Sequence, residues 1–583
     1  MNTKQSDHFW QKAIIGLSLL FFLQIISPFS QKGLFLGHDS QLHLIYLKHF
    51  EEAARAGQFP VRLIDWFVPG LNQPLFNFYQ PGVNYLFLIP RFLGFTYSTS
   101  LDILVVALWL TSALLMFLFA RRHFGTLAAI LVAYMYLLAP YHIVDVLIRS
   151  ALPEFTALTF IPGVFWAIKS YADTRRGFYL SLLSVAIALV TISHPPTIIM
   201  YSPFIFFYVL YLLYIEKSLS LLVPLITATV VGLGLVAFFL MPAFFEQKYV
   251  QTLYMRSGYY DFHHHFVCFT QLFKTFWGHG TSQEGCGDGM SFQLGIVHWF
   301  AVATAAVILV SKFTIKPNKA AKSTIVDLEK LNKSQTYLLA LALAFVVFYV
   351  YLMLKISQPI WETMPYIPFI QYSWRFLAPT IFASSLCAGA IITVFKKEVF
   401  KYAAFIIFMI ATGLAYSSYL KPIAYASVDE VNFGTEILHE SVTGIKYMTP
   451  ELGFMPRWTE ILPGDNDRPT SEVKFATQEA KLDNFKLTPA HKTYAFAVDT
   501  PTVARFYTHY FPGWEVTVDN KKVEPNFDNI YGYMDVPLDE GKHNVTLTFK
   551  NTKTRTIANV LSVNFAVVAL ALAFIFKRKP EVA

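Results

Sequence analysis

The sequence carries twelve runs of about 17–20 apolar residues, and each run is long enough to cross a bilayer as a helix. Lipid-spanning segments must satisfy their own backbone hydrogen bonds, so this pattern predicts a polytopic α-helical membrane protein. Only 14% of the residues are charged, too few to cover several soluble domains. The runs are 13–29, 101–120, 124–140, 154–170, 178–193, 197–215, 221–241, 292–311, 336–354, 378–395, 401–418 and 558–576.

The basic residues between these runs indicate how the chain is oriented. One set of alternating segments holds 19 Lys and Arg against 7 Asp and Glu, and it includes six lysines in 312–335. The positive-inside rule places these segments, and therefore both termini, in the cytoplasm. The net charge of +8 then reports membrane orientation, and we expect no nucleic-acid partner. The first run lacks a small-x-small cleavage site and should remain as an anchor.

The same topology divides the chain. We expect a transmembrane domain over 1–418, with external loops 30–100, 141–153 and 242–291, and a short interfacial or re-entrant segment at 83–94. Residues 419–557 should form an extracytoplasmic, mainly-β domain, because runs such as 514–518 and 544–549 alternate and turn residues separate them. A small β-sandwich is the natural fold for that domain. Residues 558–583 supply the last helix and a basic cytoplasmic tail.

Cys268 and Cys286 share one external loop, whereas Cys387 lies inside a predicted span. A disulfide between the first two is expected in an oxidising compartment such as a bacterial periplasm. Two free thiols remain the alternative.

The first external loop opens with His38, Asp39 and Ser40, followed by a predicted helix over Ser40–Ala56 that includes His43. Aspartate is common at helix N-termini, so Asp39 or Ser40 has an obvious structural role as a cap. The same position, where the chain leaves the membrane, also suits a general base. Spacing alone leaves both readings open.

Four further polar residues stand at external ends of predicted spans. Arg149 and Glu154 flank Pro153, and they are either a surface ion pair of little energetic value or part of a site. His194 is either interfacial packing or a cavity residue. Arg375 either snorkels to lipid headgroups or binds a phosphate with its planar fork.

A metal-binding site is another possible role for the run His263–His265, which has His279, Cys286 and Asp288 nearby. It lacks a fixed ligand spacing such as C-x₂-C or H-E-x-x-H, and so a metal site there is unsupported.

Several motifs together resemble a known group. They are Gly37-His-Asp-Ser-x-x-His43, Gly57-Gln-Phe-Pro60, Pro74-Leu-Phe-Asn-Phe-Tyr-Gln-Pro81, Arg149-Ser-Ala-Leu-Pro-Glu154, Gly289-Met-Ser-Phe-Gln-Leu-Gly295, Ser373-Trp-Arg-Phe-Leu377 and Tyr510-Phe-Pro-Gly-Trp-x-Val516. The chain resembles bacterial integral membrane proteins with a GT-C-type glycosyltransferase fold, the group labelled "6-pyruvoyl-tetrahydropterin synthase related" and the YfhO-like proteins. The resemblance covers nearly the whole chain. No soluble pterin-binding domain is visible in the sequence.

The resemblance implies an inverting glycosyltransferase in the bacterial inner membrane. Its donor would be a polyprenyl-phosphate-linked sugar, and its acceptor an envelope glycan, glycolipid or protein. Asp39 matches the catalytic carboxylate that GT-C proteins carry in the first external loop, and Glu154 is a candidate for the second. Arg375 and Arg149 would bind the donor phosphate, or a divalent ion (Mg or Mn) would take that role. His38, His43 and His194 would line or orient the same cavity.

Two other classes of function fit the sequence. One is a transporter or flippase of lipid-linked glycans, although the predicted spans are nearly free of the charges that transporters carry. The other is a non-catalytic assembly protein whose external sandwich binds polysaccharide. The polar residues cluster at external helix ends, which favours chemistry at the membrane surface.

Overall fold

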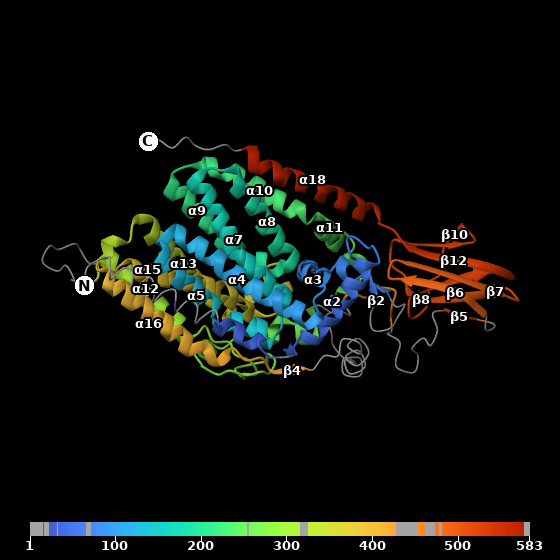
Figure 1. Cartoon of the computed structure of the whole chain (residues 1–583), viewed down its shortest axis with the longest axis horizontal. Coiled ribbons are helices and arrows are strands. Elements are labelled where there is room, and N and C mark those ends of the chain that lie inside the picture. Colours follow the sequence, from blue (N-terminus) through green and yellow to red (C-terminus); the bar gives the residue numbers. More distant parts are fainter. Residues whose placement is uncertain are drawn as a thin grey trace.

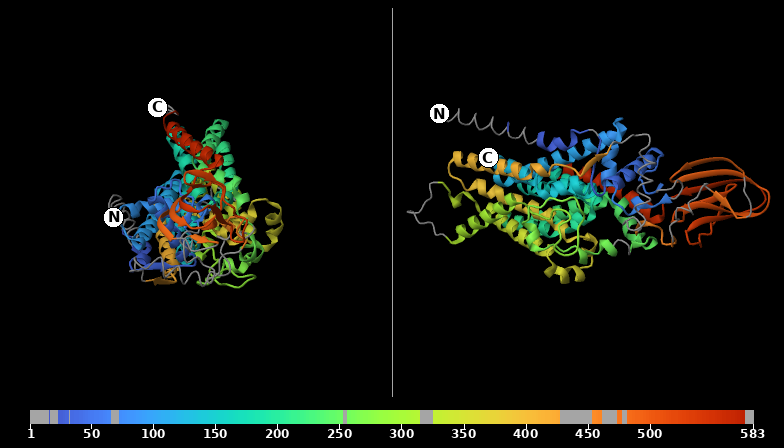
Figure 2. Two further views of the ribbon diagram at one scale, coloured as in Figure 1. Left: turned by 90° about the vertical axis from the view of Figure 1, so that its right-hand side faces the viewer. Right: turned by 90° about the horizontal axis from the view of Figure 1, so that it is seen from below.

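The computed structural model describes Gly16 and residues 23–31, 33–65, 72–252, 256–314, 325–426, 453–460, 473–476 and 481–575. A long helical body carries a β domain at one end, next to α2, α3 and α11 (Figure 1; Figure 2). The helices are α2 (Ser40–Arg55), α3 (Gly82–Phe92), α4 (Tyr97–Phe124), α5 (Thr126–Leu137), α6 (Pro140–Ile143), α7 (Leu152–Thr174), α8 (Gly177–Ser193), α9 (Pro195–Glu216), α10 (Leu222–Leu235), α11 (Ala237–Phe245), α12 (Ile296–Thr314), α13 (Lys333–Met353), α14 (Gln358–Thr363), α15 (Leu377–Thr393), α16 (Glu398–Tyr416) and α18 (Lys553–Ile575).

The helical body is that of a multi-pass membrane protein. Seven described helices are long and apolar enough to cross a membrane, and the number rises to nine if two bent pairs each count as one span. The pairs are Thr126–Leu137 with Pro140–Ile148, bent by 48°, and Leu219–Leu235 with Ala237–Phe245, bent by 72°. Every predicted run from 101–120 onward overlaps a helix, whereas 13–29 lies largely outside the described residues. The predicted fold class is confirmed, and the sidedness stays a prediction.

Helix α3 occupies the run for which an interfacial position was predicted. It has eleven residues, from Gly82 to Phe92, about half the length that a span requires. Its Ile89 and Phe92 are exposed, whereas Val83 and Phe87 are buried against the helical body. The helix is therefore half-covered, as an interfacial segment should be.

The β domain consists of two antiparallel sheets. One has the order β10-β9-β12-β7-β6 and the other β11-β8-β5. Their inward side chains, among them Phe496, Phe506, Val516 and Leu547, form one shared core, as in a sandwich. The strands are β5 (Val473–Phe475), β6 (Lys481–Thr488), β7 (His491–Val498), β8 (Thr502–His509), β9 (Trp514–Val518), β10 (Lys521–Val523), β11 (Tyr533–Leu538) and β12 (Gly541–Phe549).

The turn chemistry expected from the sequence is present in this domain. Asp519 and Asn520 join β9 to β10 and have φ of 48° and 66°. Two consecutive residues with positive φ make the two-residue hairpin turn that matches strand twist, and Asp and Asn tolerate it well.

Two short strand pairs lie on either side of α2 in the chain. β1 (Leu34–Leu36) pairs antiparallel with β4 (Ala424–Ala426), which follows α16. β2 (Ile64–Asp65) pairs with β3 (Asn72–Gln73). Helix α2 lies between these two pairs in the chain, so its N-terminus is held at the edge of the helical body.

Candidate active site

Asp39 stands immediately before α2, at the position where a cap was one of the two expected roles. Its side chain makes no capping hydrogen bond. The residue is half-buried, and its carboxylate accepts no hydrogen bond from the described residues. The neighbouring Ser40 hydroxyl instead bonds to the backbone of Gly37. The described contacts of the Asp39 carboxylate therefore give it no structural role.

The loop carrying Asp39 is fastened to the segment between α6 and α7. The His38 amide donates to the Ile148 carbonyl at 2.8 Å, and the Asp39 amide donates to the Arg149 carbonyl at 3.0 Å. A methyl group on Gly37 would lie 2.3 Å from Ser150 Oγ and 2.8 Å from the Ile148 carbonyl oxygen. Glycine is therefore needed here for the close approach of the two backbones.

Glu154, in the first turn of α7, is the centre of a buried ionic cluster. Its Oε1 accepts from the Tyr141 hydroxyl at 2.6 Å. Its Oε2 accepts from Arg149 Nη1 at 3.0 Å and from Arg375 Nε at 3.1 Å. Glu154 is 1% exposed. Both carboxylate oxygens accept hydrogen bonds, and the two bonds to Oε2 hold the two arginines in place.

Arg149 and Arg375 meet at Glu154 although they come from distant segments. Arg149 also pairs with Asp145 and lies 4.5 Å from the ring of Trp374. Arg375, in the 3-10 helix Ser373–Phe376, also donates from Nη1 to the Ile370 carbonyl at 2.7 Å. Its Nη2 has no partner among the described residues. This nitrogen is the donor that Arg375 retains for a ligand.

The charges of the cluster compensate one another. Two arginines face two carboxylates, Asp145 and Glu154, and buried charges persist only when they are paired in this way. Asp39 is a third carboxylate, outside these pairs. A phosphate would therefore be recognised by the remaining guanidinium N–H donors more than by a surplus of positive charge.

The backbone is locally unusual beside both arginines. Ser150 follows Arg149 and has φ of 53°, and Gln371 precedes the Arg375 helix and has φ of 67°. Residues 144–148 form a π-helical turn. Left-handed non-glycine residues and π-turns concentrate at functional sites, because the strain persists only where the surroundings enforce it.

Asp39 and Arg375 act on a common neighbour. Burial raises the pKa of the Tyr372 phenol, and the charges of Arg375 and Asp39 act on it in opposite directions. Together with the backbone bond between Asp39 and Arg149, this gathers Asp39, Arg149, Glu154 and Arg375 in one region, although 336 positions separate Asp39 from Arg375.

The three predicted histidines lie near this region in different ways. Burial lowers the pKa of His43 to about 4, and the charges of Asp39 and Arg149 also act on it. His38 Nε2 lies 2.9 Å from the His279 carbonyl oxygen. His194 is buried, bonds to Thr197 Oγ1 at 2.8 Å and interacts electrostatically with Glu154. No described hydrogen bond joins His38 or His43 to the Asp39 carboxylate, so the expected orienting contact is not made by either ring.

The histidines at 263–265, in the loop between α11 and α12, bond to other side chains. His263 bonds to Asp261 and His264 to Glu284, while His265 bonds to Ser282 Oγ at 2.9 Å. Within the described residues, no three His, Cys, Asp or Glu side chains are placed to share an ion. At the candidate site Asp145 and Glu154 are taken by arginines, which leaves Asp39 as the one carboxylate there without a described hydrogen-bond partner.

Cys268 and Cys286 form a disulfide, with 5.4 Å between their Cα atoms, and Cys387 is a buried free thiol. The disulfide lies in the loop between α11 and α12, whose His279 carbonyl touches His38.

Three members of the cluster were not singled out from the sequence: Asp145, Tyr141 and Trp374. For Asp145 a signal existed, because it precedes Arg149 by four residues and such a pair meets on one helix face. Tyr141 and Trp374 gave no comparable signal, since their contacts depend on how α6, α7 and the Arg375 helix pack.

No protein-family model matches the chain, and no curated protein matches it. Among solved structures it aligns with the oligosaccharyltransferase of Archaeoglobus fulgidus, crystallised with a tethered acceptor peptide. That match has a TM-score of 0.37 and 14% identity and covers 77% of this chain and 60% of the other. The apo form of the same enzyme gives a TM-score of 0.35 and 14% identity over 76% and 61%.

ArnT from Cupriavidus metallidurans, bound to undecaprenyl phosphate, gives a TM-score of 0.33 and 12% identity over 81% of this chain and 96% of the other. The chain thus spans about 60% of the oligosaccharyltransferase's length. TM-scores this low carry no argument about function. The YfhO-like resemblance stays a prediction.

Proposed function

We propose that this chain is an inverting glycosyltransferase that moves a sugar from a polyprenyl-phosphate-linked donor to an envelope glycan, glycolipid or protein acceptor. The observation that carries the proposal is Asp39. It is a half-buried carboxylate without a hydrogen-bond partner among the described residues, fastened through its backbone to Arg149. A base and a phosphate-binding arginine are thereby supplied at one place, where the chain leaves the predicted first span.

In this mechanism Asp39 takes the proton of the acceptor hydroxyl as its oxygen attacks the anomeric carbon. The bond between that carbon and the phosphate oxygen breaks, and polyprenyl phosphate leaves with the bonding electrons. A phosphate leaves readily, so no general acid is required. One in-line displacement inverts the anomeric configuration. The general base must lie within about 3 Å of the proton it removes.

Arg375 and Arg149 stabilise the charge that develops on the leaving phosphate. Glu154 acts through them as a positioning residue, because its Oε2 receives a hydrogen bond from each arginine. This differs from the expectation that Glu154 serves as a second catalytic carboxylate. The unpartnered Nη2 of Arg375 is the donor that we assign to the phosphate.

We place the protein in the bacterial inner membrane with both termini cytoplasmic and the site and β domain outside. The basic residues in 312–335 place that segment in the cytoplasm. The proposal requires that the lipid-linked donor is used on the opposite face. Labelling of a cysteine at position 520 from outside, and protection of one at position 322, would support it. The reverse pattern would contradict the topology.

Asp39→Asn tests the proposal in proteoliposomes loaded with a polyprenyl-phosphate sugar and a glycan acceptor. We expect transfer to fall by at least a thousandfold, because the amide accepts no proton. Asp261→Asn is the matched control: the Asp261 side chain caps a 3-10 helix in another external loop, accepting from the His263 amide at 3.0 Å. That variant should keep its transfer rate.

The same pair of variants separates transfer from transport. A flippase would move lipid-linked glycan across the bilayer whether or not Asp39 can accept a proton. Unchanged glycan translocation by wild type and Asp39→Asn, with no transfer by either, would contradict the proposal and favour transport.

A further inference from the structure

The loop between α11 and α12 carries exposed aromatic side chains that the proposed reaction does not use. Phe269, Phe273 and Phe276 expose 54%, 46% and 43% of their surface. The rings of Phe269 and Phe273 touch, with centroids 5.1 Å apart. We call residues 269–277 the aromatic segment. Large apolar side chains that gather on a surface mark a place of interaction.

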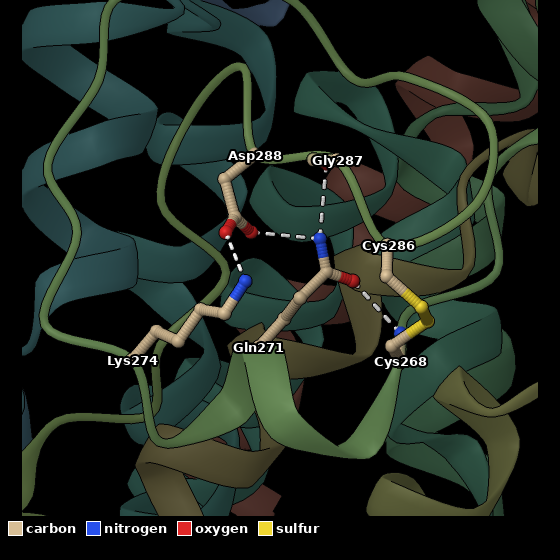
Figure 3. The surroundings of a disulfide bond; sticks show 6 residues. All are labelled: Cys268, Gln271, Lys274, Cys286, Gly287 and Asp288. Carbon is tan, nitrogen blue, oxygen red and sulfur yellow. Dashed lines mark hydrogen bonds and ion pairs between the residues drawn. A yellow bond between two sulfur atoms is a disulfide. The ribbon is translucent and has the colours of Figure 1, made fainter.

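The backbone beneath the aromatic segment is held firmly (Figure 3). The Cys268–Cys286 disulfide closes its base. Gln271, itself buried, donates to Asp288 Oδ1 at 2.8 Å, and Lys274 Nζ donates to Asp288 Oδ2 at 2.7 Å. The phenylalanines are therefore presented from a fixed scaffold, so little conformational entropy is lost when they meet a partner.

The aromatic segment continues a surface that faces lipid. Phe273 stacks on Trp299 at the start of α12, with ring centroids 4.4 Å apart, and Trp299 Nε1 donates to the Leu272 carbonyl at 2.9 Å. Helix α12 is apolar and long enough to span. Its outward side chains, exposed by 60–71%, form a stripe along the helix: Ile296, Phe300, Val307, Val310 and Phe313.

Such a stripe on a spanning helix contacts acyl chains. The aromatic segment lies at the end of the stripe where α12 begins, and so at the level of the lipid headgroups. Trp277 also stacks on Tyr419 beyond the end of α16, with centroids 4.1 Å apart. Aromatic side chains are enriched at this depth.

The same loop supports the candidate site from its other side. Ser282 Oγ accepts from Trp374 Nε1 at 3.1 Å, and the His265 carbonyl accepts from Ser373 Oγ at 2.6 Å. Trp374 is the ring beneath Arg149 and precedes Arg375. One disulfide-closed loop therefore touches both the expected lipid surface and the residues that carry the arginines.

We propose that the aromatic segment is a membrane anchor that inserts its phenylalanines into the headgroup region of the bilayer at the outer end of α12. The anchor sets the depth of Trp374, and with it the depth of Arg149 and Arg375. The insertion stands independently of the reaction, whereas its consequence for a lipid phosphate rests on the proposed function.

Spin-label depth measurements in nanodiscs test the insertion. A label is placed at Phe273→Cys in a Cys387→Ser background, without reductant, so that the disulfide stays closed and one thiol is free. Phe300→Cys on α12 is the lipid benchmark. Glu284→Cys is the aqueous control, because its side chain is 71% exposed within the same loop. We expect oxygen to relax the Phe273 label more strongly than the Glu284 label but less than the Phe300 label, and a nickel chelate to relax the Glu284 label more strongly than the Phe273 label. A Phe273 label as accessible to the chelate as the Glu284 label would overturn the proposal.

Replacing Phe269, Phe273 and Phe276 together by Ser tests the depth-setting part. The KM for a polyprenyl-phosphate sugar in liposomes should rise at least fivefold with kcat unchanged, because Arg149 and Arg375 are no longer held at the depth of the lipid phosphate. An unchanged KM would overturn that part. If wild type transfers no sugar, the proposed function fails while the depth measurement still decides the anchor.

Discussion

Glu154→Gln is the most informative single change, because the cluster depends on this carboxylate. The amide has nearly the same shape but no charge. It leaves Arg149 with Asp145 as its described ion-pair partner and Arg375 with none. Removing one partner of a buried ion pair costs about 3–5 kcal/mol. We expect the free energy of unfolding to fall by that amount, since Glu154 is 1% exposed and solvent cannot screen the loss.

The functional effect follows from the same geometry. Without the charged acceptor, the 3.1 Å bond from Arg375 Nε is weakened, and the guanidinium is held less firmly in its orientation. The KM for donor and the Kd for polyprenyl phosphate should each rise at least tenfold. The assay compares thermal unfolding in detergent with initial rates of transfer in proteoliposomes, over a range of donor concentrations.

Glu51 supplies the matched control. It is also buried, and its carboxylate receives bonds from Arg55 and Arg91, each at 2.7 Å. Glu51 lies near the C-terminal end of α2, whereas Asp39 precedes the first residue of the helix. Glu51→Gln should lower stability similarly but leave donor KM unchanged. Wild-type stability of Glu154→Gln together with complete loss of kcat would refute the reasoning, since that outcome describes a proton-transfer residue.

Three further changes have definite expected outcomes. Arg375→Lys keeps the charge but loses the planar fork that reaches Glu154, Ile370 and a phosphate together, so transfer should fall more than tenfold at normal expression; an unchanged turnover number would leave Arg375 with only its structural bonds to Glu154 and Ile370. Gly37→Ala forces the Asp39 loop away from Ser150, whose Oγ would lie 2.3 Å from the new methyl group, and transfer should fall at least tenfold; wild-type kinetics would show that the close approach is unnecessary. His43→Gln should reduce the fall in the free energy of unfolding that acidic pH causes. The pKa of His43 is lowered from 6.5 to about 4 by burial, so between these values the unfolded state binds a proton that the folded state does not, and stability falls as pH falls. The loss approaches roughly 3 kcal/mol below pH 4. The same dependence of unfolding free energy on acidic pH in wild type and variant would contradict this.

The sequence was sufficient for the elements whose signal is local. Apolar run length predicts the helices, and alternation with Asp519-Asn520 predicts the hairpin, because both depend on neighbours in the chain. The grouping of Asp39, Arg149, Glu154 and Arg375 was also expected, from the resemblance and from their places at the ends of spans.

The role of Glu154 was beyond the reach of the sequence. One of its two arginines arrives from 221 positions away, and the Tyr141 contact depends on the bend between α5 and α6. Spacing cannot reveal that both oxygens are occupied. The uncapped state of Asp39 was equally hard to predict, because distant segments hold the loop before α2: β1 pairs with β4, and the His38 and Asp39 amides donate to Ile148 and Arg149.

The pairing of β1 with β4 has a consequence for biosynthesis. Leu34–Leu36 lead directly into the Asp39 loop, and their partners Ala424–Ala426 are made almost 400 residues later. A growing chain therefore contains its first loop long before the ribosome has made Arg375 or β4. The site is completed only after α16 is inserted, so a polypeptide interrupted before residue 424 leaves the first loop without the strand that fastens it.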